Sequence, residues 1–458
     1  MQPFAIELDD RAVALARAGQ LLASSPATIF DGSAAEVAGT DAWHALRSHP
    51  TVTSSRHLAS ALTQPEVSER TLDLVAADLA RRLEVHRPTH DEPVWIASPA
   101  FADPGGLGAV LGILRGASLQ VGGFVDSATA SVAALGLDRS AIVLELGLHH
   151  AAATAVDVGG GMARRRRAVV SERGGLIELY QAWLEFISTA MVKRTRFDLL
   201  HDAVTEQQLF DAIPGLVRDA SAGIARAQFT RGTDAFEVEL SQDQFSSVAQ
   251  FLNRDILRLV HELRPAGTPV ALVMPACVAA IPGLREQIDQ FVGCDLVALA
   301  DGFAATALSA ADLPALAMDA PVQLVRRWPL QRQEALATLI SRERLGARKA
   351  SGPPPTHLLL DGRALEIGSD ALVVGRAPGG ARSVALPDGL AGVSRRHCTL
   401  VRDGHDLILL DHSSFGTFVN GERVAERVRV YAGDKVRLGD PGVEFGLIAV
   451  GEPAAVPP

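Results

Sequence analysis

The pattern of apolar residues in this chain changes at residues 350–355, which read Ala-Ser-Gly-Pro-Pro-Pro. Before this stretch, apolar runs of strand length alternate with helical patterns, which is typical of α/β domains with mixed sheets. After it, short strand patterns separated by Gly and Asp turns are typical of an all-β domain. A proline-rich run cannot continue a helix and forms a semi-rigid spacer. We therefore expect two folded domains of different class on either side of it.

The length of 458 residues exceeds that of one ordinary domain and agrees with this division. We expect an α/β body over residues 1–312, a basic helical linker with a Pro-rich end over 313–354, an all-β domain over 355–450 and a disordered tail over 451–458. Within the linker, residues 330–345 are predicted to form a helix. In the body, the predicted strands are residues 3–8, 93–99, 121–125, 141–146, 152–158, 164–170 and 270–274.

The net charge and the cysteine content indicate which classes of partner and cofactor are not expected for this chain. The net charge of −10 provides no global basic field, so a nucleic-acid partner is not expected. The three cysteines form no CxxC pair, which argues against a disulfide framework and a zinc site and predicts no metal site. The first residues lack a signal-peptide pattern, and no apolar run is long enough to insert in a membrane. We expect a cytoplasmic protein.

Four short motifs follow one another in the C-terminal part of the chain. They are Val-Gly-Arg at 374–376, Val-Ser-Arg-Arg-His at 393–397, a Gly-Thr-Phe-Val-Asn-Gly turn within 411–421, and a Gly-Asp turn within 433–439. A phosphothreonine carries nearly two negative charges and three acceptor oxygens. A guanidinium fork and a short hydroxyl donor on rigid loops suit it, and Arg376 and Ser394 can supply them. A catalytic Ser394–His397 pair is disfavoured because no oriented carboxylate or oxyanion loop is evident, so no catalytic residue is predicted here.

With these motifs in this order, residues 355–450 resemble the forkhead-associated (FHA) domain family, which forms an all-β sandwich and binds phosphothreonine peptides. The resemblance implies that Arg376 and Ser394 hold the phosphate, that Arg395 adds a further contact, and that Asn420 holds the peptide main chain or the adjoining loop. It also implies a structural role for a second set of residues, which comprises Gly375, His397, Gly416 and Thr417. Many family members have asparagine where this chain has Phe415, so one main-chain contact to the peptide is in doubt.

The body resembles the superfamily of actin, heat-shock-chaperone and sugar-kinase ATPases, and most of all the seventy-kilodalton chaperone ATPase domain. The segments that carry this resemblance are residues 4–10, 126–131, 142–147, 173–178, 270–275 and 301–307. It implies a two-lobed α/β fold in which two hairpins approach the phosphates of Mg-ATP. A working member needs small Gly and Thr residues in those hairpins and aspartates around the Mg²⁺.

The residues at these positions depart from that pattern. The first hairpin carries Glu-Leu-Asp-Asp-Arg at 7–11, the second carries Leu-His-His at 148–150, and Met-Pro-Ala at 274–276 replaces a Gly-Gly pair. We expect a degenerate domain that does not hydrolyse ATP, with no cofactor, while Glu7 and Glu145 keep a carboxylate and leave residual Mg-ATP binding open. The predicted vestigial nucleotide site comprises Glu7, Glu145, Gly147, Gly174 and Gly175.

Three other patterns favour structural interpretations. His149 and His150 are predicted to point to opposite faces of a strand and so not to share a metal ion. The glycines at 159–161 are predicted to form a hairpin turn rather than a phosphate cradle. The arginines at 164–167 lack interleaved aromatic residues, so a solvated sheet edge or a partner-facing patch is favoured over a nucleic-acid site.

Together these observations predict a phosphothreonine-binding adaptor or scaffold with a non-hydrolysing ATPase-fold body. Its expected partner is a phosphothreonine-containing protein, the substrate of a Ser/Thr kinase. The alternative is an active chaperone-type ATPase that is recruited to phosphorylated partners through the C-terminal domain. A third reading is a scaffold whose C-terminal domain binds a phosphothreonine of its own chain.

Overall fold

A computed structural model of the chain divides into two compact units. One contains residues 1–288 and 295–343, and the other contains residues 289–294 and 344–458. The residues whose structure is described are 3–32, 35–64, 66–90, 92–171, 174–231, 233–264, 268–291, 294–313, 322–331, 333–345, 354–360, 362–380, 382–387, 389–390, 392–404, 406–419, 422–424, 426–439 and 442–450.

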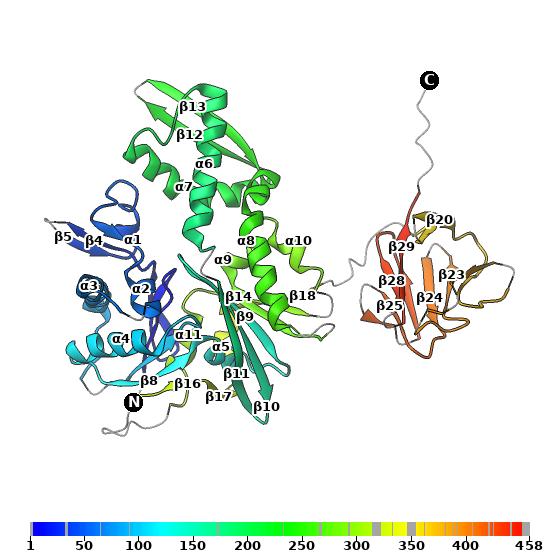
Figure 1. Cartoon of the computed structure of the whole chain (residues 1–458), viewed down its shortest axis with the longest axis horizontal. Coiled ribbons are helices and arrows are strands. Elements are labelled where there is room, and N and C mark those ends of the chain that lie inside the picture. The colour runs from blue at the N-terminus through cyan, green and yellow to red at the C-terminus, as the bar shows by residue number, and fades with distance from the viewer. Residues whose placement is uncertain are drawn as a thin grey trace. The chain divides into compact units, whose positions relative to one another are not determined.

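The first unit contains a six-stranded sheet in the order β16-β8-β7-β1-β2-β3 (Figure 1). Its strands are β1 (Phe4–Glu7), β2 (Val13–Arg17), β3 (Gln20–Ser25), β7 (Val94–Ser98), β8 (Val121–Asp126) and β16 (Leu324–Val325). The first three strands form an antiparallel meander, and β7 lies parallel to β1 on its other side. Strands β8 and β16 continue the sheet in parallel.

A seven-stranded sheet in the same unit repeats this plan in the order β17-β11-β10-β9-β14-β15-β18. Its strands are β9 (Ala141–Leu146), β10 (Ala151–Gly159), β11 (Met162–Ser171), β14 (Ala271–Pro275), β15 (Asp295–Leu299), β17 (Arg327–Pro329) and β18 (Ile340–Arg344). Here too three antiparallel strands are followed by two parallel ones. The unit therefore consists of two halves with the same strand order, β3-β2-β1-β7-β8 and β11-β10-β9-β14-β15.

Each half ends in a helix that follows its last parallel strand of that order. These are α5 (Ser127–Leu135) and α11 (Phe303–Ser309), which pack against each other and are buried along their whole length. Alanine and serine at most positions of α5 allow this close packing, and the Asp126 carboxylate caps it by accepting from the Thr129 amide at 2.9 Å. The apolar core between the two sheets forms around this helix pair.

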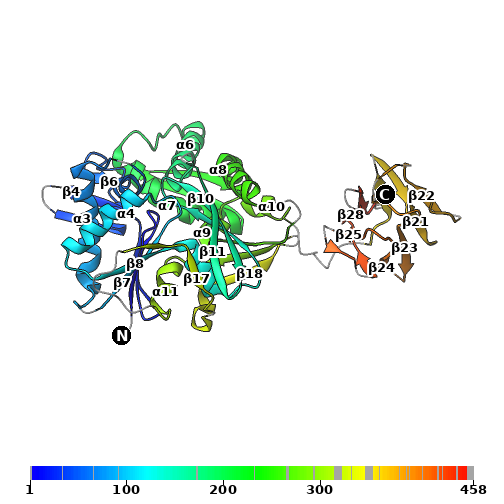
Figure 2. The same ribbon diagram turned by 60° about the horizontal axis from the view of Figure 1, so that its bottom comes forward.

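The remaining helices cover the outer faces of the two sheets or form insertions. Helices α2 (His57–Thr63), α3 (Glu69–His86) and α4 (Pro104–Gly116) pack beside the first sheet (Figure 2). Helix α8 (Gln242–Leu263) packs on β9, β10 and β11. The insertions are β4 (Ile29–Gly32), β5 (Ala35–Ala38), α1 (Thr40–Trp43) and β6 (Thr53–Ser54) in the first half, and α6 (Leu176–Thr195), α7 (Ala203–Ala222), β12 (Ile224–Arg231), β13 (Asp234–Ser241), α9 (Ala276–Ala279) and α10 (Leu284–Ile288) in the second.

The predicted helix over residues 330–345 is wrong. The segment forms a 3₁₀ helix, η1 (Glu334–Leu339), followed by strand β18, and β16 and β17 precede it. These short strands pair with the open edges of both sheets, and Trp328 is buried with its ring 6.0 Å from that of Trp95. Pairing with a free sheet edge outweighs helix propensity, which is a weak local preference. This part of the predicted linker therefore belongs to the first unit.

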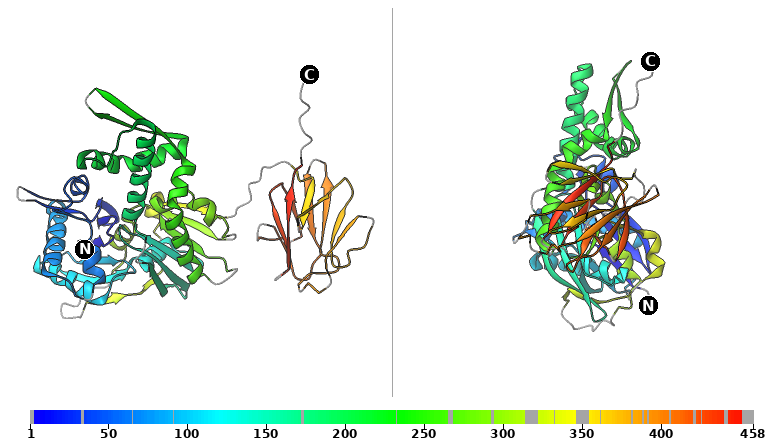
Figure 3. Two further views of the ribbon diagram at one scale, coloured as in Figure 1. Left: turned by 45° about the horizontal axis from the view of Figure 1, so that its top comes forward. Right: turned by 90° about the vertical axis from the view of Figure 1, so that its right-hand side faces the viewer.

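The second unit is a sandwich of two sheets (Figure 3), which confirms the all-β prediction. The sheets have the orders β20-β19-β29-β28-β25-β26 and β22-β21-β23-β24-β27. The strands are β19 (His357–Leu360), β20 (Arg363–Glu366), β21 (Leu372–Gly375), β22 (Ser383–Ala385), β23 (Cys398–Asp403), β24 (Asp406–Asp411), β25 (Thr417–Val419), β26 (Glu422–Arg423), β27 (Arg427–Val430), β28 (Lys435–Leu438) and β29 (Val443–Ile448). Alternate residues of these strands fill a single core, as a sheet pleat requires. The predicted tail over 451–458 lies outside the described residues.

In the part of the chain that the structure describes, no helix has the length and apolar character needed to span a membrane.

Candidate functional site

Three loops meet at one end of the second unit and carry most of the predicted binding residues. Arg376 follows β21, Ser394 and Arg395 precede β23, and Ser414 to Gly416 join β24 to β25. Main-chain bonds join the first two loops, because the Arg376 amide donates to the Ser394 carbonyl at 3.1 Å and the His397 amide donates to the Val374 carbonyl at 2.8 Å. Arg376 and Ser394, eighteen residues apart in the chain, thus lie side by side.

Gly375 makes this approach of two loops sterically feasible. A Cβ atom at Gly375 would lie 2.1 Å from the Arg395 carbonyl oxygen and 3.0 Å from the His397 nitrogen. Both neighbours are main-chain atoms, which cannot move aside as a flexible side chain could. A glycine is therefore required here by close packing.

His397 fastens the same loop to the third one from behind. Its ring is fully buried, Nδ1 accepts from the Ser394 amide at 2.9 Å, and Nε2 lies 3.2 Å from the Gly416 carbonyl oxygen. Since Nδ1 accepts a hydrogen bond, the proton resides on Nε2 and is donated to Gly416. Burial lowers the pKa of His397, which keeps the ring in this neutral form. The residue therefore holds two loops in place, with both ring nitrogens engaged by main-chain groups.

A second brace, which sequence reasoning missed, lies inside the third loop. The Asp411 carboxylate accepts from the Thr417 hydroxyl at 2.7 Å and from the Ser413 amide at 2.9 Å. Burial alone would raise the pKa of Asp411, but these hydrogen bonds outweigh it and lower the pKa. Gly416 closes the turn with φ of 88°, and its amide donates to the Ser413 hydroxyl. The Asp-x-Ser spacing, which favours such a side-chain turn, was the available signal.

Arg376 and Arg395 carry positive charge at the site and form no ion pair with any residue that the structure describes. Arg376 donates from Nε to the Val393 carbonyl at 2.6 Å, which orients the guanidinium and leaves its Nη groups available. Among the described residues no carboxylate forms an ion pair with Arg376 or with the exposed Arg395. The Ser394 oxygen accepts from the Ser414 amide at 3.2 Å, so its hydroxyl proton remains available to an external acceptor. The arrangement is suited to an oxyanion with several acceptor oxygens.

The family model of the FHA domain matches residues 372–439, which contain all three loops. The second unit carries an FHA domain. Domains of this family bind phosphothreonine-containing peptides. No curated protein matches the chain. In this FHA domain, Arg376, Ser394 and Arg395 lie together at the mouth of the site, and Gly375, His397, Gly416 and Thr417 support them, while Asn420 lies outside the described residues.

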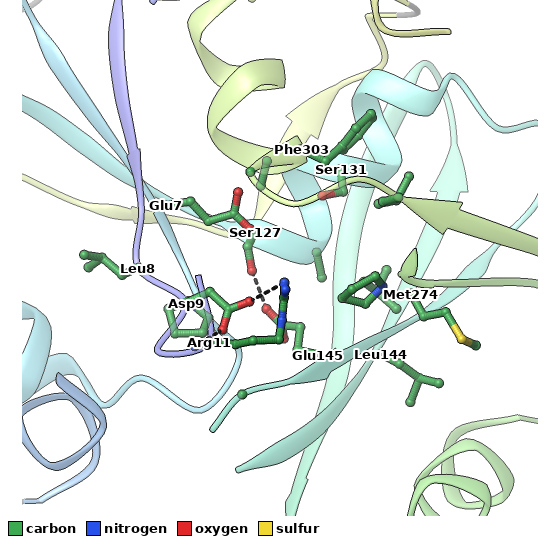
Figure 4. Close-up of a pocket in the computed structure, with 18 of the residues that line it drawn as sticks. Glu7, Leu8, Asp9, Arg11, Ser127, Ser131, Leu144, Glu145, Met274 and Phe303 are labelled. Atoms are coloured by element: carbon green, nitrogen blue, oxygen red, sulfur yellow. Dashed lines mark hydrogen bonds and ion pairs between the residues drawn. The ribbon is translucent and has the colours of Figure 1, made fainter. Parts of the chain in front are cut away.

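Three residues of the predicted vestigial nucleotide site, Glu7, Glu145 and Gly147, line one pocket between the two halves of the first unit (Figure 4), whereas Gly174 and Gly175 do not line it. Glu7 and Glu145 line a pocket with Asp9, Arg11 and Ser127, and the Ser127 hydroxyl donates to Glu145. Burial, helped by Asp9, raises the pKa of Glu7 to about 7, and burial, helped by Asp126, raises the pKa of Glu145 to about 8. Glu145 is thus mostly protonated at neutral pH, and Glu7 is divided about equally between its two protonation states.

Asp10 follows β1, and its side chain reaches the main chain of the turn between β9 and β10, a contact that the sequence did not reveal. Its carboxylate accepts from the main-chain amides of Leu148 at 2.8 Å and His149 at 3.2 Å. A Cβ atom at Gly147 would lie 2.0 Å from the Asp10 carboxylate oxygen, and one at Gly175 would lie 2.1 Å from the Leu148 carbonyl. Gly147 and Gly175 therefore permit close packing around an internal carboxylate.

Other polar side chains also join the two halves of the first unit. Arg11 bridges Asp9 at 3.1 Å and Asp301 at 2.6 Å, and the buried Asp126 pairs with Arg165 at 2.7 Å. Arg165 is thus partly buried, and Arg164 is paired with Arg327 of β17 and so does not lie at the predicted sheet edge. Arg164, Arg166 and Arg167 are exposed.

The histidine pair at 149–150 lies in the turn after β9 and not, as predicted, within a strand. His149 is bound by Ser55 at 3.0 Å and 3.1 Å, and His150 stacks on Phe101. Glycines 160 and 161 form the predicted hairpin turn between β10 and β11. The described residues contain no group of three or more His, Cys, Asp or Glu side chains that could hold a metal ion.

Proposed function

We propose that this chain is a phosphothreonine-binding adaptor. Its FHA domain captures a cytoplasmic protein that a Ser/Thr kinase has phosphorylated, with Arg376 and Ser394 on the phosphate and Arg395 beside them. The observation that carries the proposal is the pairing of an uncompensated guanidinium with an available hydroxyl on three mutually braced loops. All three cysteines are free, in keeping with a reducing compartment.

For the first unit we propose a two-lobed actin/chaperone-like ATPase fold that serves as a protein-interaction body. Support comes from the repeated strand order in its two sheets and from the equivalent positions of α5 and α11. Two sequence segments of the resemblance, 126–131 and 301–307, fall at the starts of these helices.

The residues of the cleft do not fit Mg-ATP, which favours a non-hydrolysing domain. The amides of Leu148 and His149, which a phosphate would need, already donate to Asp10. The pocket beside them has a cavity volume of about 50 Å³, which holds only on the order of four waters. The occupied amides and the small cavity together disfavour the active-ATPase alternative.

Phosphorylation dependence tests the proposed adaptor role. We expect the full-length protein to bind a subset of phosphothreonine peptides on an array and to ignore their unphosphorylated copies. The physical reason is that a plain threonine offers neither the charge nor the acceptor oxygens that the loops are arranged to meet. Equal binding of both forms would contradict the proposal, and phosphatase treatment of the array provides the control.

Calorimetry with Mg-ATP tests the proposal for the first unit. We expect no heat of binding at millimolar nucleotide and no phosphate release above the rate without protein, because the phosphate-facing amides are already bonded. Nucleotide binding with steady phosphate release would instead establish an active ATPase. A known chaperone-type ATPase in the same buffer serves as the positive control.

A further inference from the structure

An exposed aromatic side chain lies at the edge of the phosphate-binding loops. Phe415 has 58% of its surface exposed, which is the highest value among the large apolar side chains of the FHA domain that the structure describes. Its neighbours in the chain are both fastened to the site, because the Ser414 amide donates to the Ser394 hydroxyl oxygen and the Gly416 carbonyl accepts from His397. The ring is thus presented to solvent directly beside the proposed phosphate position.

The side chain of Arg423 lies against the same loop. Arg423, on β26, is paired in register with Phe418 on β25. A Cβ atom at Gly416 would lie 2.9 Å from Arg423 Nε, so the arginine side chain packs against the Gly416 main chain. Arg423 is exposed and forms no ion pair with any residue that the structure describes. The left-handed backbone at residue 416, with φ of 88°, favours a glycine there.

We propose that Phe415 and Arg423 form a selectivity surface that reads the residues flanking the phosphothreonine, with an apolar side chain on Phe415 and an anionic side chain on Arg423. This inference rests on the proposed function of the same site. Phe415 has no polar group to hold a peptide main chain, so what it offers a ligand is apolar contact area. To the charges of Arg376 and Arg395, Arg423 adds a further positive charge that has no ion-pair partner among the described residues. This additional charge complements a ligand with a second anionic group.

Two sources of anionic side chain share the chemistry that Arg423 recognises, namely an acidic residue and a second phosphorylated residue. Both present oxygens to a guanidinium, and the phosphate carries the larger charge. We expect an apolar residue at the favoured position to strengthen binding about five- to tenfold over alanine. An acidic residue at its position should strengthen binding about two- to fivefold at low salt, and less at high salt.

The test is a positional scan with the full-length protein. In each peptide the phosphothreonine is kept, and each flanking position in turn carries alanine, leucine, aspartate or phosphoserine. We expect Phe415→Ala to remove the leucine preference and Arg423→Gln to remove the preference for aspartate and phosphoserine, while each variant keeps the other preference. Matched controls are Leu365→Ala and Arg363→Gln on β20, an exposed apolar residue and an exposed arginine on the opposite edge of the sheet.

The outcomes separate this inference from the one on which it rests. If phosphothreonine peptides bind but both variants keep the wild-type preferences, the selectivity surface is refuted and the adaptor role stands. If no phosphothreonine peptide binds at all, the adaptor role itself is refuted, and the selectivity surface with it.

Discussion

Replacing Arg376 by alanine is expected to weaken the binding of a phosphothreonine peptide about 10- to 100-fold, the effect of losing one or two charge-assisted hydrogen bonds. The Nη groups of Arg376 have no ion-pair partner in the described residues, so no internal salt bridge is lost with them. The loss should therefore appear in peptide affinity far more than in the stability of the fold. Fluorescence anisotropy with a labelled peptide selected from the array measures it directly.

Two further variants allow the result for Arg376→Ala to be interpreted. Arg376→Lys keeps the positive charge but loses the planar fork, so its affinity should fall between those of the wild type and the alanine variant. Arg363→Ala removes an exposed arginine from β20, at the far edge of the sheet, and should bind as the wild type does. An Arg376→Ala protein that is folded and binds peptide with unchanged affinity would rule out the assigned phosphate contact.

Replacing Asp10 by alanine is expected to lower the stability of the first unit by about 2–5 kcal/mol. The change leaves the amides of Leu148 and His149 buried without an acceptor, and each such orphan costs about 1–3 kcal/mol. All four tryptophans, Trp43, Trp95, Trp183 and Trp328, lie in this unit, so their fluorescence during urea unfolding follows it and not the FHA domain.

Asp10→Asn is the matched control for this experiment, because its amide oxygen still accepts a hydrogen bond while the charge is removed. We expect a smaller loss of stability than for alanine. Phosphopeptide binding should be unchanged in both variants, since Asp10 belongs to the other compact unit. If Asp10→Ala unfolds at the same urea concentration as the wild type, the Asp10 side chain does not hold the turn between β9 and β10, and the proposal that it blocks nucleotide binding loses its support.

The share of the structure that could be predicted from the sequence differs between the two units. Seven strands of the body, β1, β7 to β11 and β14, were predicted within a few residues, because buried apolar runs such as 94–98 and 141–146 carry their own periodicity. Other strands of the body, among them β2, β3, β12, β13 and β15, were not predicted. The strands β16, β17 and β18 were also not predicted, because each is short and is stabilised by a sheet edge formed from distant parts of the chain. Likewise, Asp411 and Asp10 were not assigned as braces, since an acid in a loop has the same local pattern whether or not amides surround it.

The sequence by itself predicted an all-β FHA domain in the C-terminal part of this chain and predicted Arg376 and Ser394 as its phosphate contacts. That prediction rested on short motifs at the ends of strands and on their resemblance to the FHA family, because such motifs are local in the chain. Only the tertiary structure decided that Arg423 packs against the loop that carries Phe415, and that an aspartate from one half of the body accepts hydrogen bonds from amides of the other. Both arrangements depend on contacts between segments that no local periodicity relates.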